Sequence, residues 1–139
     1  MKDRSIGVIP VKIERGKFLF LLVQEIRGYW GFPKGHPESG ESETETALRE
    51  LNEETDINKC EILSGFRYVQ KYTFQIDENE FEKEAVFFVG LVEKEKESLN
   101  STEIRCLKWL NFEDSLEQLT YEESRQMLKE AFEFLKDLK

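Results

Sequence analysis

An acidic segment directly behind a loop rich in glycine and proline is the feature that most constrains this sequence. The segment from Glu38 to Asp56 contains eight acidic residues and one base, Arg49, so it sums to −7 of the chain's formal charge of −9. Like charges one helical turn apart destabilise a helix. A concentration of this kind therefore needs a structural or chemical explanation.

The segment carries the signature of a helix. Ser42 is followed three residues later by Glu45, which is the capping-box spacing, and this predicts a helix from that point to about residue 54 or 55. At about 100° per residue, one stripe of this helix is acidic, and Ala47, Leu48 and Leu51 form a separate stripe that faces the core. The acidic stripe consists of Glu43, Glu50, Glu53 and Glu54.

Two explanations of the acidic stripe compete. Runs of charge are usually solvated helix faces. Alternatively, a divalent cation removes the repulsion, and ligands that are all carboxylates favour a hard ion such as Mg²⁺ or Mn²⁺ over zinc. Arg49 can reach Glu53 at i+4, so it can orient one carboxylate without occupying a metal site.

The flanking sequence predicts strands and helices in mixed order. Near-continuous apolar character at 5–13 and 17–24 predicts two strands buried on both faces, and the Gly/Pro-rich loop follows the second strand at residues 27–40. Strands are expected at 5–13, 17–24, 62–75, 85–93 and 106–110, with turns at 14–16 and 77–80 and helices at 112–119 and 121–138. This order predicts an α+β fold in which a mixed β-sheet packs between helices.

Length and composition indicate the number of domains and the kind of protein. The 139 residues predict a single domain spanning 1–139. No apolar run approaches the length that crosses a bilayer, and the start lacks a signal peptide. Cys60 and Cys106 are too few for a disulfide framework and show no zinc spacing. We therefore expect a cytoplasmic, reduced protein without a membrane partner, and the acidic balance argues against broad binding of nucleic acid.

The spacing around the acidic helix resembles the Nudix box, which here spans residues 35–57. Gly35, Glu41 and the run Arg-Glu-Leu-Asn-Glu-Glu-Thr-Asp-Ile at 49–57 match its specified positions, except that Asp56 stands where the box has Gly. The resemblance implies a left-handed backbone there, which Asp visits more readily than most residues. We expect a local stability cost and no loss of metal ligands. The order of elements is also similar to a Nudix domain, which implies an α/β/α sandwich.

The resemblance implies a metal-dependent hydrolase that cuts a pyrophosphate bond of a nucleoside diphosphate linked to another group, with Mg²⁺ or Mn²⁺ as cofactor. Glu53 and Glu54 would bind metal together with the backbone carbonyl of Lys34. Glu50 would be a further ligand or the group that orients and deprotonates water. Gly35, Glu41 and Arg49 would support the geometry of loop and helix.

A subfamily resemblance lies outside the box. Residues 29–36, Tyr-Trp-Gly-Phe-Pro-Lys-Gly-His, are similar to the Trp-x-x-Pro-Lys-Gly-His approach of asymmetrical diadenosine tetraphosphate hydrolases. Residues 101–104 and 108–110 look like their Glu-His…Arg-Trp-Leu segment, with Ile104 in place of the His. This implies that Glu103 is a further carboxylate near the metals and a second candidate base, so the candidate catalytic residues are Glu50, Glu53 and Glu103.

Candidate substrate contacts come from the loop and the later strands: Lys34, His36, Lys71, Lys83 and Phe87. Lys83 and Phe87 match positions that grip phosphate and stack adenine in the subfamily. The alternatives are a surface role for His36, a core position for Phe87 and solvated edges for the lysines. Tyr29 and Trp30 either cap the core or flank the nucleotide.

The expected function is asymmetrical cleavage of diadenosine tetraphosphate into ATP and AMP by water attack on phosphorus. Enzymatic alternatives are removal of pyrophosphate from the 5′ end of RNA and hydrolysis of a nucleoside triphosphate. An alternative of another class is a non-catalytic Nudix domain that senses a nucleotide. The expected partner is a small nucleotide, with RNA 5′ ends as the exception. The sequence leaves the oligomeric state open.

Overall fold

The computed structural model describes residues 2–93, 97–98 and 102–138. Ser101, part of the segment compared with the diadenosine tetraphosphate hydrolases, lies outside the described residues. The strands are β1 (Lys2–Glu14), β2 (Lys17–Glu25), β3 (Trp30–Gly31), β4 (Lys34–Gly35), β5 (Cys60–Ile62), β6 (Tyr68–Ile76), β7 (Asn79–Val92) and β8 (Ile104–Leu110). The helices are α1 (Glu43–Thr55), α2 (Phe112–Gln118) and α3 (Glu122–Lys136).

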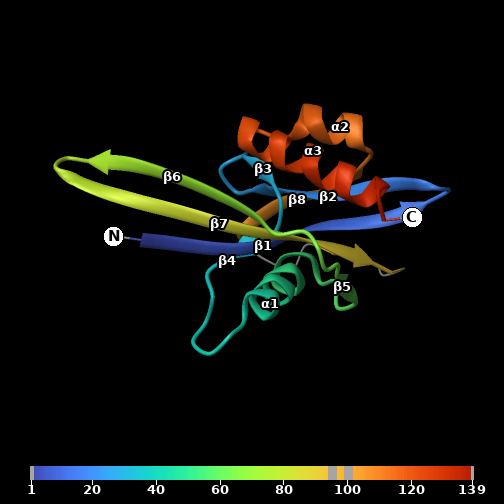
Figure 1. The fold of residues 1–139 in the computed structure, drawn as a ribbon, viewed down its shortest axis with the longest axis horizontal. Helices are drawn as coiled ribbons and strands as arrows, with labels where there is room; N and C mark the ends of the chain where they lie inside the picture. Colours follow the sequence, from blue (N-terminus) through green and yellow to red (C-terminus); the bar gives the residue numbers. More distant parts are fainter. Residues whose placement is uncertain (1, 94–96, 99–101, 139) are drawn as a thin grey trace.

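The strands form a mixed sheet, which confirms the predicted fold class. The order along the sheet is β3-β2-β1-β7-β5, with β4 on β1, β6 on β7 and β8 on β2. The pair β1–β7 is parallel and the other pairs are antiparallel. Helix α1 covers one face, and α2 and α3 cover the other (Figure 1). Within the described ranges, no helix is both long and apolar enough to cross a membrane.

Alternation along the central strands supplies a core on each face of the sheet. In β7, Val86 and Phe88 pack towards Ala47 and Leu51 of α1. Their neighbours in the same strand pack with α3: Ala85, Phe87 and Val89 contact the cluster that contains Met127, Leu128, Ala131 and Leu135. Successive side chains of a strand point to opposite faces, so a continuously apolar strand is what a sheet covered on both sides requires.

The sequence merged two strands that the structure separates. The predicted strand 62–75 is two strands, β5 and β6, because the chain turns between them where Gly65 adopts a φ of 102°. The predicted turn at 77–80 is shorter, with Asp77 at a φ of 58° and β7 beginning at Asn79. Two short strands, β3 and β4, also lie in the stretch that the sequence predicts as loop.

The two central strands diverge, and this divergence positions the site. Strand β1 pairs with β2 only over residues 11–14, and at Ile6 and Gly7 it pairs with β4 instead. Strand β2 continues beside β3 and β8. Gly7 permits the close approach of β4, because a Cβ there would overlap the Pro33 carbonyl oxygen and the Lys34 side chain. The loop that contains β3 and β4 thus enters between β1 and β2.

Candidate active site

A cavity of about 1250 Å³ lies where β1 and β2 diverge. Helix α1, the loop after β2, β1, β7 and the turn before β8 all contribute side chains to its walls. Most of the sequence-predicted residues meet there: Lys34, Gly35, His36, Arg49, Glu50, Glu53, Glu54, Lys83, Phe87 and Glu103. Glu41 and Lys71 do not line it.

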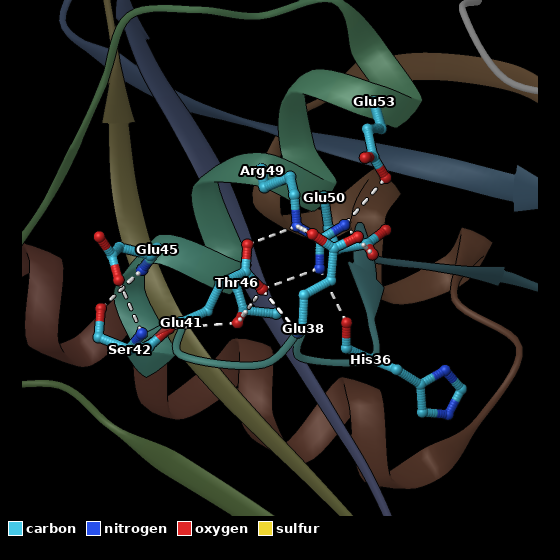
Figure 2. Close-up of polar contacts among 9 residues, drawn as sticks. All are labelled: His36, Glu38, Glu41, Ser42, Glu45, Thr46, Arg49, Glu50 and Glu53. Atoms are coloured by element: carbon cyan, nitrogen blue, oxygen red, sulfur yellow. Dashed lines mark hydrogen bonds and ion pairs between the residues drawn. The ribbon is translucent and has the colours of Figure 1, made fainter.

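Arg49, which also lines the cavity, ties the loop to α1 (Figure 2). Its Nε and Nη2 donate to the two carboxylate oxygens of Glu41 at 2.6 and 3.0 Å. Nη2 also donates to the backbone carbonyl of His36 at 2.8 Å. Glu41 accepts further bonds from the Glu38 N–H and the Thr46 hydroxyl, and the hydrogen bonds from Arg49 are the main reason that its pKa falls to about 2. These contacts agree with the supporting role that the box implies for Glu41 and Arg49.

Glu50 lies against the backbone of β4. A Cβ at position 35 would overlap the carboxyl carbon and both oxygens of Glu50, so only glycine allows this approach. Nη1 of Arg49 donates to Glu50 at 2.9 Å and to Glu53 at 3.1 Å (Figure 2). The predicted i,i+4 contact between Arg49 and Glu53 is therefore confirmed.

The acidic stripe of α1 is not uniform. Glu54 is buried, with 6% of its surface exposed, whereas 53% of the Glu53 side chain is exposed. Glu54 follows Ala47 by seven residues and Leu51 by three, so it lies at the edge of the buried stripe. Burial, followed by the charges of Glu50 and Glu103, raises the pKa of Glu54 to about 8, although the backbone N–H of Lys34 donates to its carboxylate.

Glu103 joins the carboxylates of α1 from a distant part of the chain. The Ile26 N–H donates to the backbone carbonyl of Glu103 at 2.9 Å, which fixes the turn before β8 to the loop after β2. Burial is the largest cause that raises the pKa of Glu50, and the charge of Glu103 adds to it. The structure thus brings the carboxylate of the subfamily segment into the same cavity. Ile104, at the position of the subfamily His, is buried.

The predicted substrate contacts fall into two groups. Lys34 and Lys83 line the cavity, and burial, followed by the charge of Lys83, lowers the pKa of Lys34. Lys71 is exposed and lies on the other face of the β6–β7 pair, since its register partner is Glu84 and not Lys83. Phe87 touches the cavity but is only 4% exposed and packs edge-on against Phe32 at 6.5 Å, as its core alternative requires.

The two aromatic residues of the loop have different environments. Trp30 belongs to the core, and its backbone N–H donates to the Thr120 hydroxyl at 2.8 Å. Tyr29 is 39% exposed and faces Tyr121 with the ring centroids 5.6 Å apart. Trp30 therefore caps the core, while Tyr29 flanks the cavity, where Arg27 lies over its ring.

Asp3, Glu25 and Tyr121 are among the cavity residues that were not predicted from the sequence. Glu25 ends β2 immediately before the loop, and its charge acts on Lys34 and Glu54. A polar residue at the end of a buried strand was the available signal for Glu25. Asp3 and Tyr121 had no such signal, because they reach the cavity through strand pairing and the position of α3.

The donor chemistry of the cavity fits a hard divalent cation. Glu103 lies close enough that its charge raises the pKa of Glu50 and of Glu54, and carboxylate oxygens are the ligands that Mg²⁺ and Mn²⁺ prefer. Among the described residues, no group of three or more acidic, His or Cys side chains is gathered in ligand geometry. Glu50 and Glu53 are both bonded to Arg49.

Comparisons with known proteins agree on the family. The sequence model of the NUDIX domain matches residues 1–131. The chain is 32% identical over 133 residues to the bis(5′-nucleosyl)-tetraphosphatase [asymmetrical] of Rattus norvegicus, covering 92% of this chain and 87% of that protein. It is 29% identical over 120 residues to the RNA pyrophosphohydrolase of Helicobacter pylori (strain P12), covering 81% and 77%. The crystal structure of a C. elegans Ap4A hydrolase binary complex has a TM-score of 0.85 at 26% identity, covering 97% and 98%.

Proposed function

This chain belongs to the Nudix family of hydrolases, which act on pyrophosphate bonds, and we propose that its substrate is a dinucleoside polyphosphate. The reaction would be the asymmetrical cleavage of diadenosine tetraphosphate into ATP and AMP. One observation carries the proposal: carboxylates and lysine side chains line the same large cavity, together with the paired rings of Tyr29 and Tyr121.

The cationic side chains of the cavity suit the binding of a polyphosphate, and its carboxylates suit the binding of a metal ion that takes part in hydrolysis. Lys34 and Lys83 offer positive charge to a chain of phosphates, and together with His36 they offer hydrogen bonds. The volume of about 1250 Å³ exceeds the roughly 300–1000 Å³ of common ligand pockets. That size is in keeping with a ligand that has two nucleoside ends.

Glu50, Glu53, Glu54, Glu103 and the carbonyl of Lys34 are the proposed ligands of Mg²⁺ or Mn²⁺. When bound, the cation would neutralise phosphate charge and acidify the attacking water. Burial of Glu54 and its hydrogen bond from Lys34 fix one carboxylate relative to β4. Arg49 orients Glu50 and Glu53 from the other side.

Glu50 and Glu103 are the two candidates for the residue that orients water and accepts its proton. Glu50 is rigidly held between Gly35 and Arg49, whereas Glu103 lies on an exposed turn. We propose Glu50 for this role and a metal-binding role for Glu103. Glu103→Gln should then lower the affinity for Mg²⁺ while high Mg²⁺ restores most of kcat. A loss of kcat of about 100-fold or more that Mg²⁺ does not restore would transfer the role to Glu103.

The substrate is tested with a panel assayed in Mg²⁺. It contains diadenosine tetraphosphate, nucleoside triphosphates, diphosphoinositol phosphates and triphosphorylated RNA, compared by kcat/KM. The expected result is the highest kcat/KM for diadenosine tetraphosphate, with ATP and AMP as products. Glu54→Gln serves as the inactive control for contaminating hydrolases.

The second candidate is hydrolysis of the 5′ end of RNA, which the similarity to an RNA pyrophosphohydrolase favours. An RNA substrate needs a path out of the cavity for the nucleotides that follow the first one. A dinucleotide substrate needs only a place at the edge of the cavity for its second nucleoside. A kcat/KM for triphosphorylated RNA above that for diadenosine tetraphosphate would decide for this alternative.

A further inference from the structure

Three charged or polar side chains from separate parts of the chain meet at the mouth of the cavity. Asp3 comes from β1, His36 follows β4, and Lys83 comes from β7. Asp3 Oδ1 lies 2.7 Å from His36 Nε2, and Asp3 Oδ2 lies 3.9 Å from Lys83 Nζ. One carboxylate thus contacts both partners, each through a different oxygen.

The backbone fixes this meeting. Asp3 and Lys83 are register partners in the parallel pair β1–β7, so their side chains leave the sheet on the same face. The carbonyl of His36 accepts from Arg49, while its ring points away from the Arg49 network (Figure 2). Arg49 therefore sets the loop so that the ring is directed to Asp3.

The contacts of Asp3 are those that a phosphate would make. A carboxylate and a phosphate both offer several acceptor oxygens to His and Lys donors. The interaction is also exchangeable, because the side chains of Asp3, His36 and Lys83 are 43%, 68% and 44% exposed. Exposed pairs of this kind are weak.

We propose that Asp3 is a built-in counter-ion that occupies His36 and Lys83 in the free protein and yields them to a phosphate group of the substrate. This rests on the proposed function only in that a phosphate chain enters the cavity. Asp3 would then be a residue that tunes affinity for polyanions and not a catalytic residue. Its removal should free two phosphate contacts.

The test uses methylenediphosphonate, a pyrophosphate analogue that is not hydrolysed, titrated by calorimetry in Mg²⁺. Asp3→Asn should tighten binding about threefold, the size expected for weak exposed pairs. Glu117→Gln on α2 removes the same charge at an exposed position away from the cavity and should leave affinity unchanged. In kinetics, the Asp3→Asn gain should fall on KM and not on kcat.

A variant that lacks both partners of Asp3 separates competition for His36 and Lys83 from a general effect of removing one negative charge. In H36Q/K83Q the D3N substitution should have no effect, because the partners for which Asp3 competes are gone. A gain in that background equal to the gain in the wild type would overturn the proposal, and so would weaker binding by D3N alone. If dinucleotides fail in the substrate panel while D3N still tightens methylenediphosphonate binding, the counter-ion holds and the substrate proposal falls.

Discussion

At the scale of single residues, the site depends on one missing side chain as much as on the charges present. The carboxylate of Glu50 occupies the space where any other residue at position 35 would place its Cβ. Because Arg49 holds Glu50 from the opposite side, the carboxylate cannot retreat without breaking that bond. Gly35 therefore determines where Glu50 lies.

Gly35→Ala should lower kcat/KM by about 100-fold, the order of loss that a displacement of roughly 1 Å causes at a reacting centre. The φ of Gly35 is not in the left-handed region, so alanine should leave the backbone and the fold intact. Steady-state kinetics on diadenosine tetraphosphate, with circular dichroism as the check on folding, measures this. Activity of Gly35→Ala equal to that of the wild type would contradict the argument.

At the scale of the element, α1 is fixed at its start, along its length and at its end. Ser42 and Glu45 form the predicted capping box. Glu43, which helical spacing predicted on the acidic stripe, instead accepts hydrogen bonds from Arg67 at 2.9 and 2.7 Å and also from Arg4. The first turn thus belongs to the scaffold, and the following turns present carboxylates to the cavity.

Asp56, at the end of α1, is the one position where the sequence departs from the Nudix box. Asp56 has the left-handed backbone that the resemblance implied, with φ 64° and ψ 15°. The free energy of unfolding of Asp56→Gly should exceed that of the wild type by about 0.5 kcal/mol, because glycine adopts this conformation without a Cβ penalty. That of Asp56→Ala should be lower than the wild type by about 1 kcal/mol, because alanine visits the left-handed region less readily than Asp. Urea denaturation measures the series. Stabilisation by alanine would show that the position is not strained.

At the scale of the whole molecule, several acids of the segment 38–56 pair with bases, some of which come from elsewhere in the chain. Arg49 bonds Glu41, Glu50 and Glu53 within the segment. Arg4 of β1 and Arg67, between β5 and β6, bond Glu43. Glu54 differs from these acids because it is buried. The free energy needed to keep its carboxylate charged therefore depends on the packing of the folded state as a whole.

The pKa of Glu54, about 8, lies above its ordinary value of 4.5. Between these values the folded chain binds more protons than the unfolded chain, so the free energy of unfolding should fall as pH rises from 5 to 8 and then level off. The loss attributable to Glu54 is up to about 5 kcal/mol. Glu54→Gln in EDTA should match the wild type near pH 5 and exceed its stability at pH 9. Denaturant titrations across this range check it.

Mg²⁺ should reverse that loss, because a ligand of the folded state stabilises it. At pH 8 the thermal midpoint of the wild type should rise with Mg²⁺, and that of Glu54→Gln should rise much less. An equal rise in both would remove Glu54 from the proposed ligands.

Much of the fold and site follows from local signals. The capping box, the i,i+4 contact of Arg49 and the apolar strands depend on residues close in sequence, and all are confirmed. The division of strand 62–75 was missed because residues 63–67 remain apolar in part while Gly65 turns the chain. A pattern of hydropathy along the sequence does not reveal that one residue has adopted a left-handed φ.

The sequence by itself determined the family, the acidic helix and the sheet between helices, since spacing along one helix and alternation along strands are set by backbone geometry. Only the tertiary structure decided which acid is buried, that Phe87 and Trp30 are core residues, and that Lys71 faces away from the cavity. It alone placed Asp3 with the site. These outcomes depend on the pairing of distant strands, which separates residues adjacent in sequence and joins residues that are remote.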